Sequence, residues 1–120
     1  MTVHDPQLLK GVLSLLLLGL LAEQESYGYQ LVQRLRRLGL SGLAEGTVYP
    51  ALARLEREGR VVGRLVQSRS GPARKYYRPT ADGYAALRDG SAAWQAMAAA
   101  VTPILARPIP DEPAPPSDED

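Results

Sequence analysis

The sequence predicts a mainly α-helical fold that includes one small β-hairpin. Apolar residues recur at helical spacing in three segments before residue 60, and a basic stretch with β-branched residues follows them. A further long helical pattern begins after Thr80 and continues to about Pro103. With 120 residues, the chain is long enough for one domain with a modest core.

Residues 7–23 are expected to form the first helix. Pro6 suits a helix start, and residues 11–22 are almost wholly apolar. This run is too short to cross a bilayer, which takes about 20 residues, and no cleavage site of small residues follows it. We therefore expect neither a membrane span nor a signal peptide. A helix that is apolar all round is instead expected to be buried, here between two subunits.

The second helix is expected between Ser26, as its N-cap, and Gly39, as its stop. Its apolar stripe consists of Leu31, Leu35 and Leu38. A glycine-rich loop at residues 39–46 then leads to the third helix.

The third helix contains a proline close to its start. Thr47 is the expected N-cap, because its hydroxyl can accept a hydrogen bond from an otherwise unpaired backbone N–H. Pro50 then stands at the third helical position, where a backbone N–H would have no partner within the helix. Gly59 is expected to end the helix.

The third helix has two faces when its residues are placed about 100° apart. The face that is predicted to meet the core consists of Val48, Ala51, Leu52 and Leu55. The opposite face is flat at Ala53 and is bordered by Arg54 and Arg57. Such a face suits contact with a partner, although an ordinary solvated helix would show the same pattern.

A β-hairpin is expected after the third helix. Residues 60–66 form one strand, residues 68–72 (SRSGP) a turn, and residues 74–78 (RKYYR) the second strand. Tyr76 and Tyr77 point to opposite faces of that strand, and Tyr77 is expected in the core. Three helices followed by a basic hairpin is the layout of a winged helix-turn-helix. In that fold the third helix enters the major groove of DNA, and the hairpin meets phosphates or the minor groove.

The charge distribution points the same way. Residues 34–78 contain eleven basic and three acidic residues, a net charge of +8, although the whole chain has only +1. Residues 108–120 contain five acids and no base. A basic middle of the chain suggests a polyanionic partner, for which double-stranded DNA is the candidate, while a merely solvated surface is the alternative.

The last helix, expected at about residues 81–103, carries a heptad-like stripe. Its members are Tyr84, Leu87, Ser91, Trp94, Ala98, Val101 and, beyond Pro103, Leu105. So small a domain offers little for this stripe to pack on, so a second copy of the chain is the expected partner. The expected organisation is a DNA-binding domain at 1–80, a dimerisation helix at 81–106, and a disordered, proline-rich acidic tail at 107–120.

An enzyme is not expected. The chain has one histidine and no cysteine, and it lacks metal-ligand clusters, a nucleophile elbow and a phosphate-binding loop. We therefore predict no catalytic residue, no metal and no cofactor. The absence of cysteine fits a reducing cytoplasm, where we expect the protein. The remaining alternative is a winged helix that serves protein–protein contact without specific DNA binding.

Three sequence elements together resemble the PadR family of transcriptional regulators. These elements are GTVYPALARLEREG at residues 46–59, GPARKYYRPTADG at residues 71–83, and Tyr27-Gly28-Tyr29. The resemblance covers about residues 8–105, and the single helix after the hairpin is similar to the smaller subfamily. One departure is Pro79, where the family usually has Leu or Ile, so a core contact is expected to be lost and the second strand to end early.

The resemblance implies a homodimer that represses transcription by binding a palindromic operator, with its first and last helices at the dimer interface. The interface is then expected to include Leu13, Leu16, Leu17, Leu20, Tyr84, Leu87, Trp94 and Val101. The expected DNA-binding residues are Tyr27, Thr47, Tyr49, Arg54, Arg57, Arg69, Arg74 and Lys75. For Tyr49 the alternative is packing against the preceding loop.

Trp94, the only tryptophan, has two interpretations. It packs in the dimer core, or it lines a cavity between subunits and stacks on a small aromatic ligand, as the resemblance implies for some small members of the family.

Overall fold

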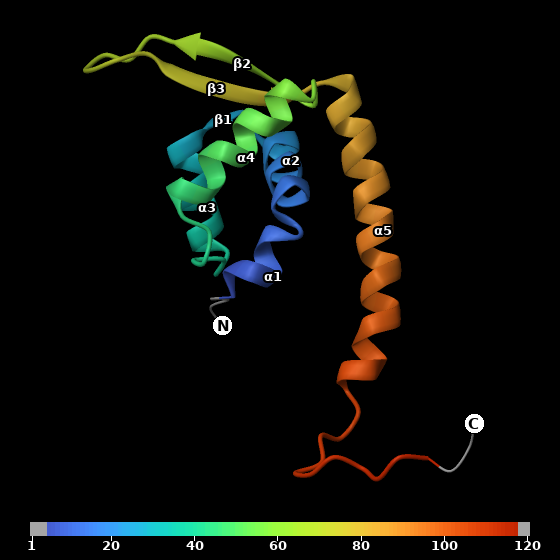
Figure 1. Ribbon diagram of the computed structural model, residues 1–120. Coiled ribbons are helices and arrows are strands. Elements are labelled where there is room, and N and C mark those ends of the chain that lie inside the picture. Colours follow the sequence, from blue (N-terminus) through green and yellow to red (C-terminus); the bar gives the residue numbers. More distant parts are fainter. Residues whose placement is uncertain (1–4, 118–120) are drawn as a thin grey trace.

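The computed structural model describes residues 5–117 and confirms a mainly helical fold with a small antiparallel sheet. Its elements are α1 (Pro6–Lys10), α2 (Leu13–Glu23), β1 (Ser26–Tyr27), α3 (Gly28–Arg37), α4 (Glu45–Arg57), β2 (Val61–Val66), β3 (Arg74–Pro79) and α5 (Ala81–Leu105). Helices α1 to α4 form a bundle below the β2–β3 hairpin, and α5 runs down one side of it (Figure 1). The lower part of α5 extends beyond the other helices.

The predicted first helix is in fact two helices. Asp5 starts α1, because its carboxylate accepts hydrogen bonds from the backbone N–H groups of Gln7 and Leu8. The chain then leaves the helical conformation at Val12, which has φ −116° and ψ 4°. This turn lets two helix segments of different direction cover the same core instead of one straight helix.

Ser26 does not cap α3, contrary to prediction. It lies buried in β1, where its hydroxyl donates to the Gln24 carbonyl and accepts from Arg34 at 3.0 Å. Tyr27 is the N-cap residue, and its backbone N–H donates to the Gln30 side chain. A strand pairing therefore prevailed over a local cap, because β1 completes the sheet beside β3.

The stripe of α3 and its end are mostly as predicted. Leu31 and Leu35 are fully buried, whereas Leu38 is 62 % exposed because it lies at the C-cap, outside the helical core face. Gly39 follows with φ 83°, a left-handed conformation that glycine adopts without strain, and it ends the helix.

Helix α4 begins earlier than predicted. Its N-cap is Ala44, not Thr47, and the backbone N–H of Thr47 already donates to the Ala44 carbonyl. Pro50 is therefore the sixth residue of the helix rather than the third. The prediction was wrong because Thr47 looked like a cap in isolation, whereas the chain had already turned at Ala44. Pro50 has no N–H that could donate to the carbonyl of Gly46, one turn earlier. Because Gly46 is exposed, its carbonyl can accept a hydrogen bond from water instead.

The core lies between α2, α3 and α4 and confirms the predicted inner face of α4. Val48, Leu52 and Leu55 are completely buried, and Ala51 packs against the same cluster. The other core residues are Leu9, Leu13, Leu17, Leu18, Leu20, Leu21, Leu31, Val32, Leu35, Leu43 and Val61. A helix anchored this firmly on one side presents its opposite side as a rigid surface.

The sheet has the order β1-β3-β2, and the hairpin register pairs Gly63 with Tyr77. Tyr77 packs against the core, as predicted. Pro79 does not shorten the second strand: it pairs with Val61, is buried, and ends β3 one residue later than expected. A proline is tolerated there because it is the last residue of the strand, and the Thr80 N–H then donates to the Arg60 carbonyl.

Thr80 caps α5, as predicted, because its hydroxyl accepts from the Gly83 N–H and donates to the Gly59 carbonyl. Gly83 lies so close to the chain that an added Cβ would stand 2.0 Å from the Arg60 carbonyl oxygen. This glycine therefore lets α5 start directly against the base of the hairpin. The helix passes through Pro103 and ends at Leu105.

Beyond α5, residues 107–117 contain no helix or strand. The first four residues of the expected DNA-binding domain and the last three of the expected tail lie outside the described residues. Within the described range, no helix is both long enough and apolar enough to span a bilayer.

Candidate nucleic-acid interface

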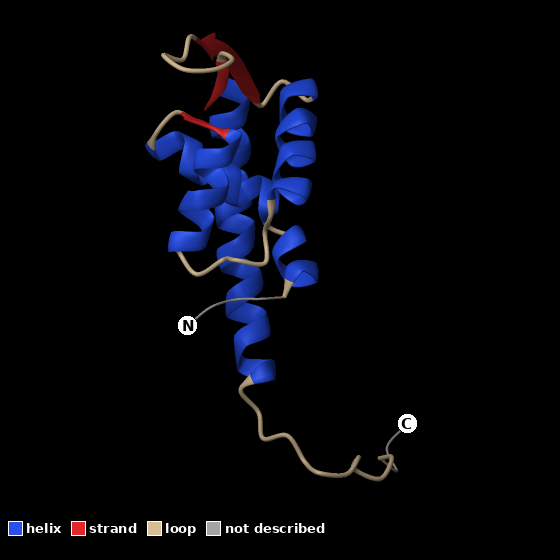
Figure 2. Cartoon of the chain, turned by 90° about the vertical axis from the view of Figure 1, so that its left-hand side faces the viewer, coloured by secondary structure: helices blue, strands red, loops and turns tan. Residues whose placement is uncertain are grey.

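One end of the molecule brings together the exposed face of α4, the start of α3 and the hairpin. Figure 2 shows the sheet at this end, with the helices filling the rest of the molecule. Because α4 has its core face buried against α2 and α3, its outer face points away from the bundle. This end therefore carries most of the residues that the sequence predicted as DNA contacts.

The outer face of α4 consists of exposed Tyr49, Ala53, Arg54 and Arg57. Arg54 forms an ion pair with Glu58 one turn later, at 3.3 Å, and its side chain remains 70 % exposed. Such an exposed pair on a helix contributes little, so it can open when a stronger anion approaches. No ion pair of Arg57 is found within residues 5–117. Both guanidinium groups are available to an external acceptor.

Tyr49 contacts the start of α3, whereas the alternative that the sequence offered was packing against the loop before α4. Its ring lies so close to Gly28 that an added Cβ there would stand 2.0 Å from a ring carbon. Burial of the ring raises the pKa of Tyr49, and the Glu45 carboxylate raises it further. The ring is still 45 % exposed, so one side chain both joins two helices and faces solvent.

Tyr27 and Tyr76 form an aromatic pair on the outer face of the sheet, with ring centroids 5.2 Å apart. The Arg74 guanidinium lies 4.7 Å from the Tyr27 ring centroid, a cation–π contact. The structure therefore brings the predicted residues Tyr27 and Arg74 together, although they are distant in sequence. Tyr76 completes this cluster and was not among the predicted DNA contacts.

Lys75 lies on the other face of the hairpin. Since side chains alternate along a strand, Lys75 points toward α4 while Arg74 points away from it. Its ammonium forms an ion pair with Glu56 of α4 at 2.8 Å, and this hydrogen bond raises the pKa of Lys75. Lys75 is thus separated from the Tyr27–Arg74 cluster.

The two remaining predicted contacts lie at the edges of this surface. Arg69 is exposed in the turn of the hairpin. Thr47 is half-buried in the first turn of α4. Tyr29 was not among the predicted DNA contacts, yet it is 41 % exposed and directly follows Gly28, the residue that Tyr49 contacts. Its place in the Tyr-Gly-Tyr element was the available sequence signal.

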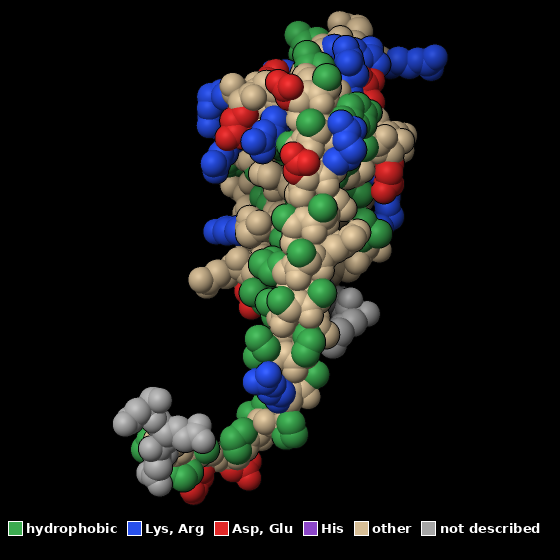
Figure 3. Space-filling model, turned by 90° about the vertical axis from the view of Figure 1, so that its right-hand side faces the viewer, with side chains coloured by type: hydrophobic (Ala, Val, Ile, Leu, Met, Phe, Trp, Pro, Cys, Tyr) green, Lys and Arg blue, Asp and Glu red, His purple; other side chains and the backbone are tan. Residues whose placement is uncertain are grey.

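Ion pairs lower the net charge that this region presents to solvent. Arg64 of β2 donates to both carboxylate oxygens of Glu25, at 2.9 and 3.1 Å from its Nε, and this contact lowers the pKa of Glu25. Arg34 is largely enclosed and pairs with Glu23. Figure 3 shows Lys and Arg side chains over the part of the molecule that holds the bundle and hairpin, with Asp and Glu side chains among them. The excess of basic over acidic residues in 34–78 keeps this part of the chain net positive.

The predicted dimer residues fall into two groups. Leu13, Leu17 and Leu20 are at most 8 % exposed within their own chain, so they belong to the subunit core and have little surface left for a partner. Leu16 and Leu87 are partly buried and pack against that core. The predicted interface residues that keep exposed apolar surface are on α5: Tyr84, Trp94 and Val101. Met97, Ile104 and Leu105 of the same helix are also exposed, and of these three only Leu105 belonged to the predicted stripe. Figure 3 shows hydrophobic side chains along the lower half of α5.

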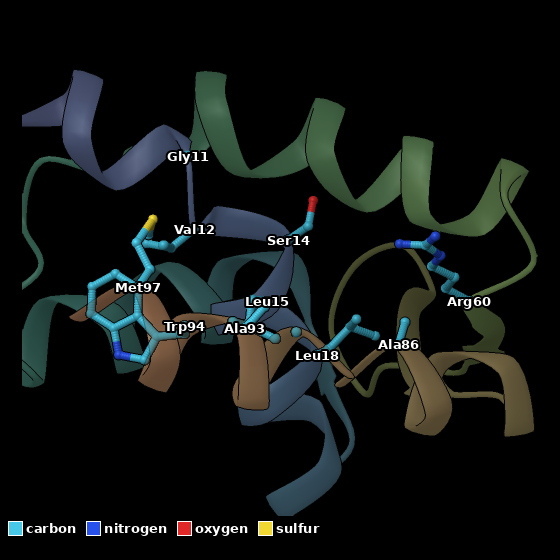
Figure 4. Close-up of a pocket in the computed structure, with 11 residues that line it drawn as sticks. Gly11, Val12, Ser14, Leu15, Leu18, Arg60, Ala86, Ala93, Trp94 and Met97 are labelled. Atoms are coloured by element: carbon cyan, nitrogen blue, oxygen red, sulfur yellow. The ribbon is translucent and has the colours of Figure 1, made fainter. Parts of the chain in front are cut away.

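A groove of about 320 Å³ runs between α5 and the junction of α1 with α2. Trp94 and Met97 lie at one end of it and Arg60 at the other, with Leu15 and Leu18 between them (Figure 4). Most of its wall is apolar. Trp94 is 47 % exposed, so its indole is accessible in a single chain.

Comparisons with known proteins agree with this arrangement. The model of the transcriptional regulator PadR-like family matches residues 17–89. The chain is 40 % identical over 79 residues to the transcriptional regulator Rv3488 of Mycobacterium tuberculosis, covering 64 % of this chain and 70 % of that protein.

Solved structures with the same fold include a PadR-like transcriptional regulator from Bacillus cereus. It is 35 % identical, with a TM-score of 0.76 over 85 % of this chain and 99 % of that one. A PadR family transcriptional regulator from Eggerthella lenta is 34 % identical, also with a TM-score of 0.76, over 85 % of this chain and 88 % of that one.

Proposed function

We propose that this chain, which belongs to the PadR-like family of transcriptional regulators, is a homodimeric repressor that binds a palindromic operator in the cytoplasm. The observation that carries this proposal is the outer face of α4. It is a rigid helix face, flat at Ala53, with two available arginines beside it and a basic hairpin at its end. No feature of the described residues favours a second class of function.

In this proposal α4 is the recognition helix and lies in the major groove. Ala53 allows close approach, and Arg54 and Arg57 reach base edges or phosphates, where a guanidinium pairs well with guanine. Thr47 and Tyr49, in the first two turns of α4, approach the DNA backbone, because their side-chain hydroxyl groups can donate hydrogen bonds to phosphate. Arg69 and Arg74 of the hairpin, with Tyr27 beside Arg74, meet phosphates next to the groove.

Dimerisation in this proposal uses α5. Its exposed Trp94, Met97, Val101 and Ile104 recur at spacings of three and four and form an apolar strip, which begins beside the groove and continues toward the end of α5. Covering each Å² of such a strip contributes about 25 cal/mol. A second copy with two-fold symmetry would place two recognition helices on two half-sites, which is why the operator is expected to be palindromic.

The groove beside Trp94 supports a further element of this proposal, release of DNA by a small aromatic ligand. An indole at one end of an apolar groove can stack on a flat guest. Such a ligand would weaken operator binding only as far as it prefers the arrangement of subunits that cannot bind DNA. The alternative is that Trp94 simply packs against the second subunit.

Selection from randomised double-stranded DNA with the purified protein tests the proposed function. We expect enrichment of one palindromic sequence, whose binding weakens steeply as salt rises. Recovery of no preferred sequence, together with binding that survives high salt, would show that this winged helix does not act as a specific DNA regulator.

A further inference from the structure

We infer that Glu56 of α4 and Lys75 of β3 form a positioning pair that sets the angle of the hairpin against the recognition helix. Through that angle the pair determines how well the protein distinguishes its operator from other DNA. This inference rests on the proposed function and assigns Lys75 a role other than the phosphate contact expected from the sequence.

The pair joins the two elements that would contact DNA. The Lys75 Nζ lies 2.8 Å from the Glu56 Oε1, and the side chains are 43 % and 35 % exposed. It is the one side-chain hydrogen bond between α4 and the hairpin within residues 5–117. The base of the hairpin is anchored in the core through Val61 and Tyr77, so the pair acts farther out, nearer the tip.

Gly63 provides the path for the lysine side chain. An added Cβ at Gly63 would stand 2.4 Å from the Cε of Lys75 and 3.1 Å from its Cγ. Glycine inside a strand weakens the strand, and it is favoured where another group must approach closely. The Lys75 side chain therefore crosses the neighbouring strand over Gly63 to reach Glu56. In this position its ammonium also lies 5.6 Å from the centroid of the Tyr77 ring.

Arg74, the preceding residue, holds the other face of the same strand. Its guanidinium stacks on Tyr27 at the start of α3. This contact adds no new anchor, because Tyr27 belongs to β1, which is already paired with β3. The Lys75 pair with Glu56 is therefore the side-chain contact that sets the angle of the outer hairpin against α4.

The two possible roles of Lys75 predict opposite effects of Glu56. If Lys75 bound phosphate, the Glu56 carboxylate would compete with DNA, so Glu56→Gln would strengthen binding and leave sequence preference unchanged. If the pair positions the hairpin, Glu56→Gln loosens it, and the preference for the operator falls. Gly63→Ala is informative for the same reason, since it displaces Lys75 from Glu56 without changing any charge.

A measurement without DNA tests the positioning itself. The chain contains no cysteine, so Ala53→Cys on α4 and Ser70→Cys in the hairpin turn provide a unique pair of spin-label sites. Labelled chains are mixed with excess unlabelled chain, so that each measured distance lies within one subunit. We expect a narrow distance distribution that broadens in Glu56→Gln, Lys75→Gln and Gly63→Ala. The charge-swapped chain, Glu56→Lys with Lys75→Glu, should be narrow again.

The matched control is Glu58→Gln, which removes the same charge from the same end of α4 but breaks only the pair with Arg54. Its distance distribution should equal that of the unsubstituted chain. Unchanged distributions in all three test variants would overturn the inference, whatever the protein does with DNA.

The second measurement is the ratio of affinities for the selected operator and for unrelated DNA. We expect this ratio to fall about two- to fivefold in the three test variants, which is the effect expected from the loss of one partly exposed ion pair. The ratio should recover in the charge-swapped chain. The inference is wrong if Lys75→Gln weakens binding to the operator and to unrelated DNA equally, and reduces the slope of log affinity against log salt by the amount expected for one lost phosphate contact, while Gly63→Ala has no effect. Failure of the proposed function would appear separately, as no preferred sequence for the unsubstituted protein.

Discussion

The ring of Tyr49 on α4 lies directly on Gly28, the first residue of α3. No other residue type fits at position 28 without moving this ring. The contact joins the first part of α4 to the preceding helix and leaves nearly half of the tyrosine exposed to solvent. It gives a physical reason for the glycine between the two tyrosines of the Tyr-Gly-Tyr element.

Gly28→Ala should therefore destabilise the protein by about 1–3 kcal/mol, the usual cost of forcing an extra methyl group into a packed site. The free energy of unfolding, from urea titration, measures this cost. The cost should shrink in a Tyr49→Ala background, where the ring is absent. Gly46→Ala is the matched control, since an added Cβ there meets nothing within 4 Å and alanine favours a helix. Equal effects of the two glycine substitutions would mean that the Tyr49 contact is unimportant.

Arg57→Ala should lose about 1–3 kcal/mol of operator binding and relax the preference at one base pair, if its guanidinium reads a base edge. Titration of the operator and of its single-base variants measures both effects. Arg88→Ala is the control, because this exposed arginine lies on α5, outside the proposed interface. Equal loss on every sequence would instead assign Arg57 to phosphate.

Arg74→Ala should weaken binding to all DNA sequences alike and reduce the slope of log affinity against log salt by about one. The reason is that a hairpin cation next to the groove meets phosphate, which carries no sequence information. Affinities measured over a range of salt concentrations provide the slope. An unchanged slope would show that this side of the hairpin does not contact DNA.

Val101→Asp should yield a monomer, because it places a charge in the apolar strip of α5 that a second copy is proposed to cover. Truncation after Asp89 removes the strip and should weaken both dimerisation and operator binding. Sedimentation at micromolar concentration measures the mass. An unsubstituted chain that is a clean monomer and still binds its operator would contradict the proposed dimer.

A planar hydrophobic compound should quench Trp94 fluorescence and lower operator affinity, since the indole borders an apolar groove. Trp94→Ala should abolish the loss of operator affinity while the dimer persists. Binding of the compound to this variant is followed by its own absorbance or fluorescence, because the protein then has no tryptophan. If no compound quenches, or if Trp94→Ala falls to monomer, the indole is part of the dimer core.

Stability should decrease as the pH falls through the acidic range, partly because of Glu25. Its pKa is lowered in the folded chain by the hydrogen bonds from Arg64, below the ordinary value of 4.5. The stabilisation is therefore complete above 4.5 and is lost as the pH falls through the lower, folded pKa. Arg64→Gln should remove this part of the acid dependence, as measured by unfolding titrations at about pH 7 and about pH 3. Parallel pH profiles for both chains would exclude the effect.

Much of this fold could be predicted from local patterns. The inner face of α4, the glycines that end α3 and α4, the cap at Thr80 and the hairpin each depend on residues close together in the sequence. Spacing decides which helix face is apolar, and glycine at positive φ decides where a helix stops, so neither needs knowledge of the rest of the chain. The break at Val12 and the early start of α4 were missed, because packing overrode the local signals.

Only the tertiary structure decided which groups meet. Glu56 and Lys75 are 19 residues apart, and Glu25 and Arg64 are 39 apart. A charge pattern identifies the basic residues, but whether each faces solvent or an internal carboxylate depends on how strands and helices are placed. The same holds for Leu17, which the apolar run marked as an interface residue and the packed subunit buries completely. Sequence periodicity determines that a side chain is covered, whereas the packing of distant segments determines what covers it.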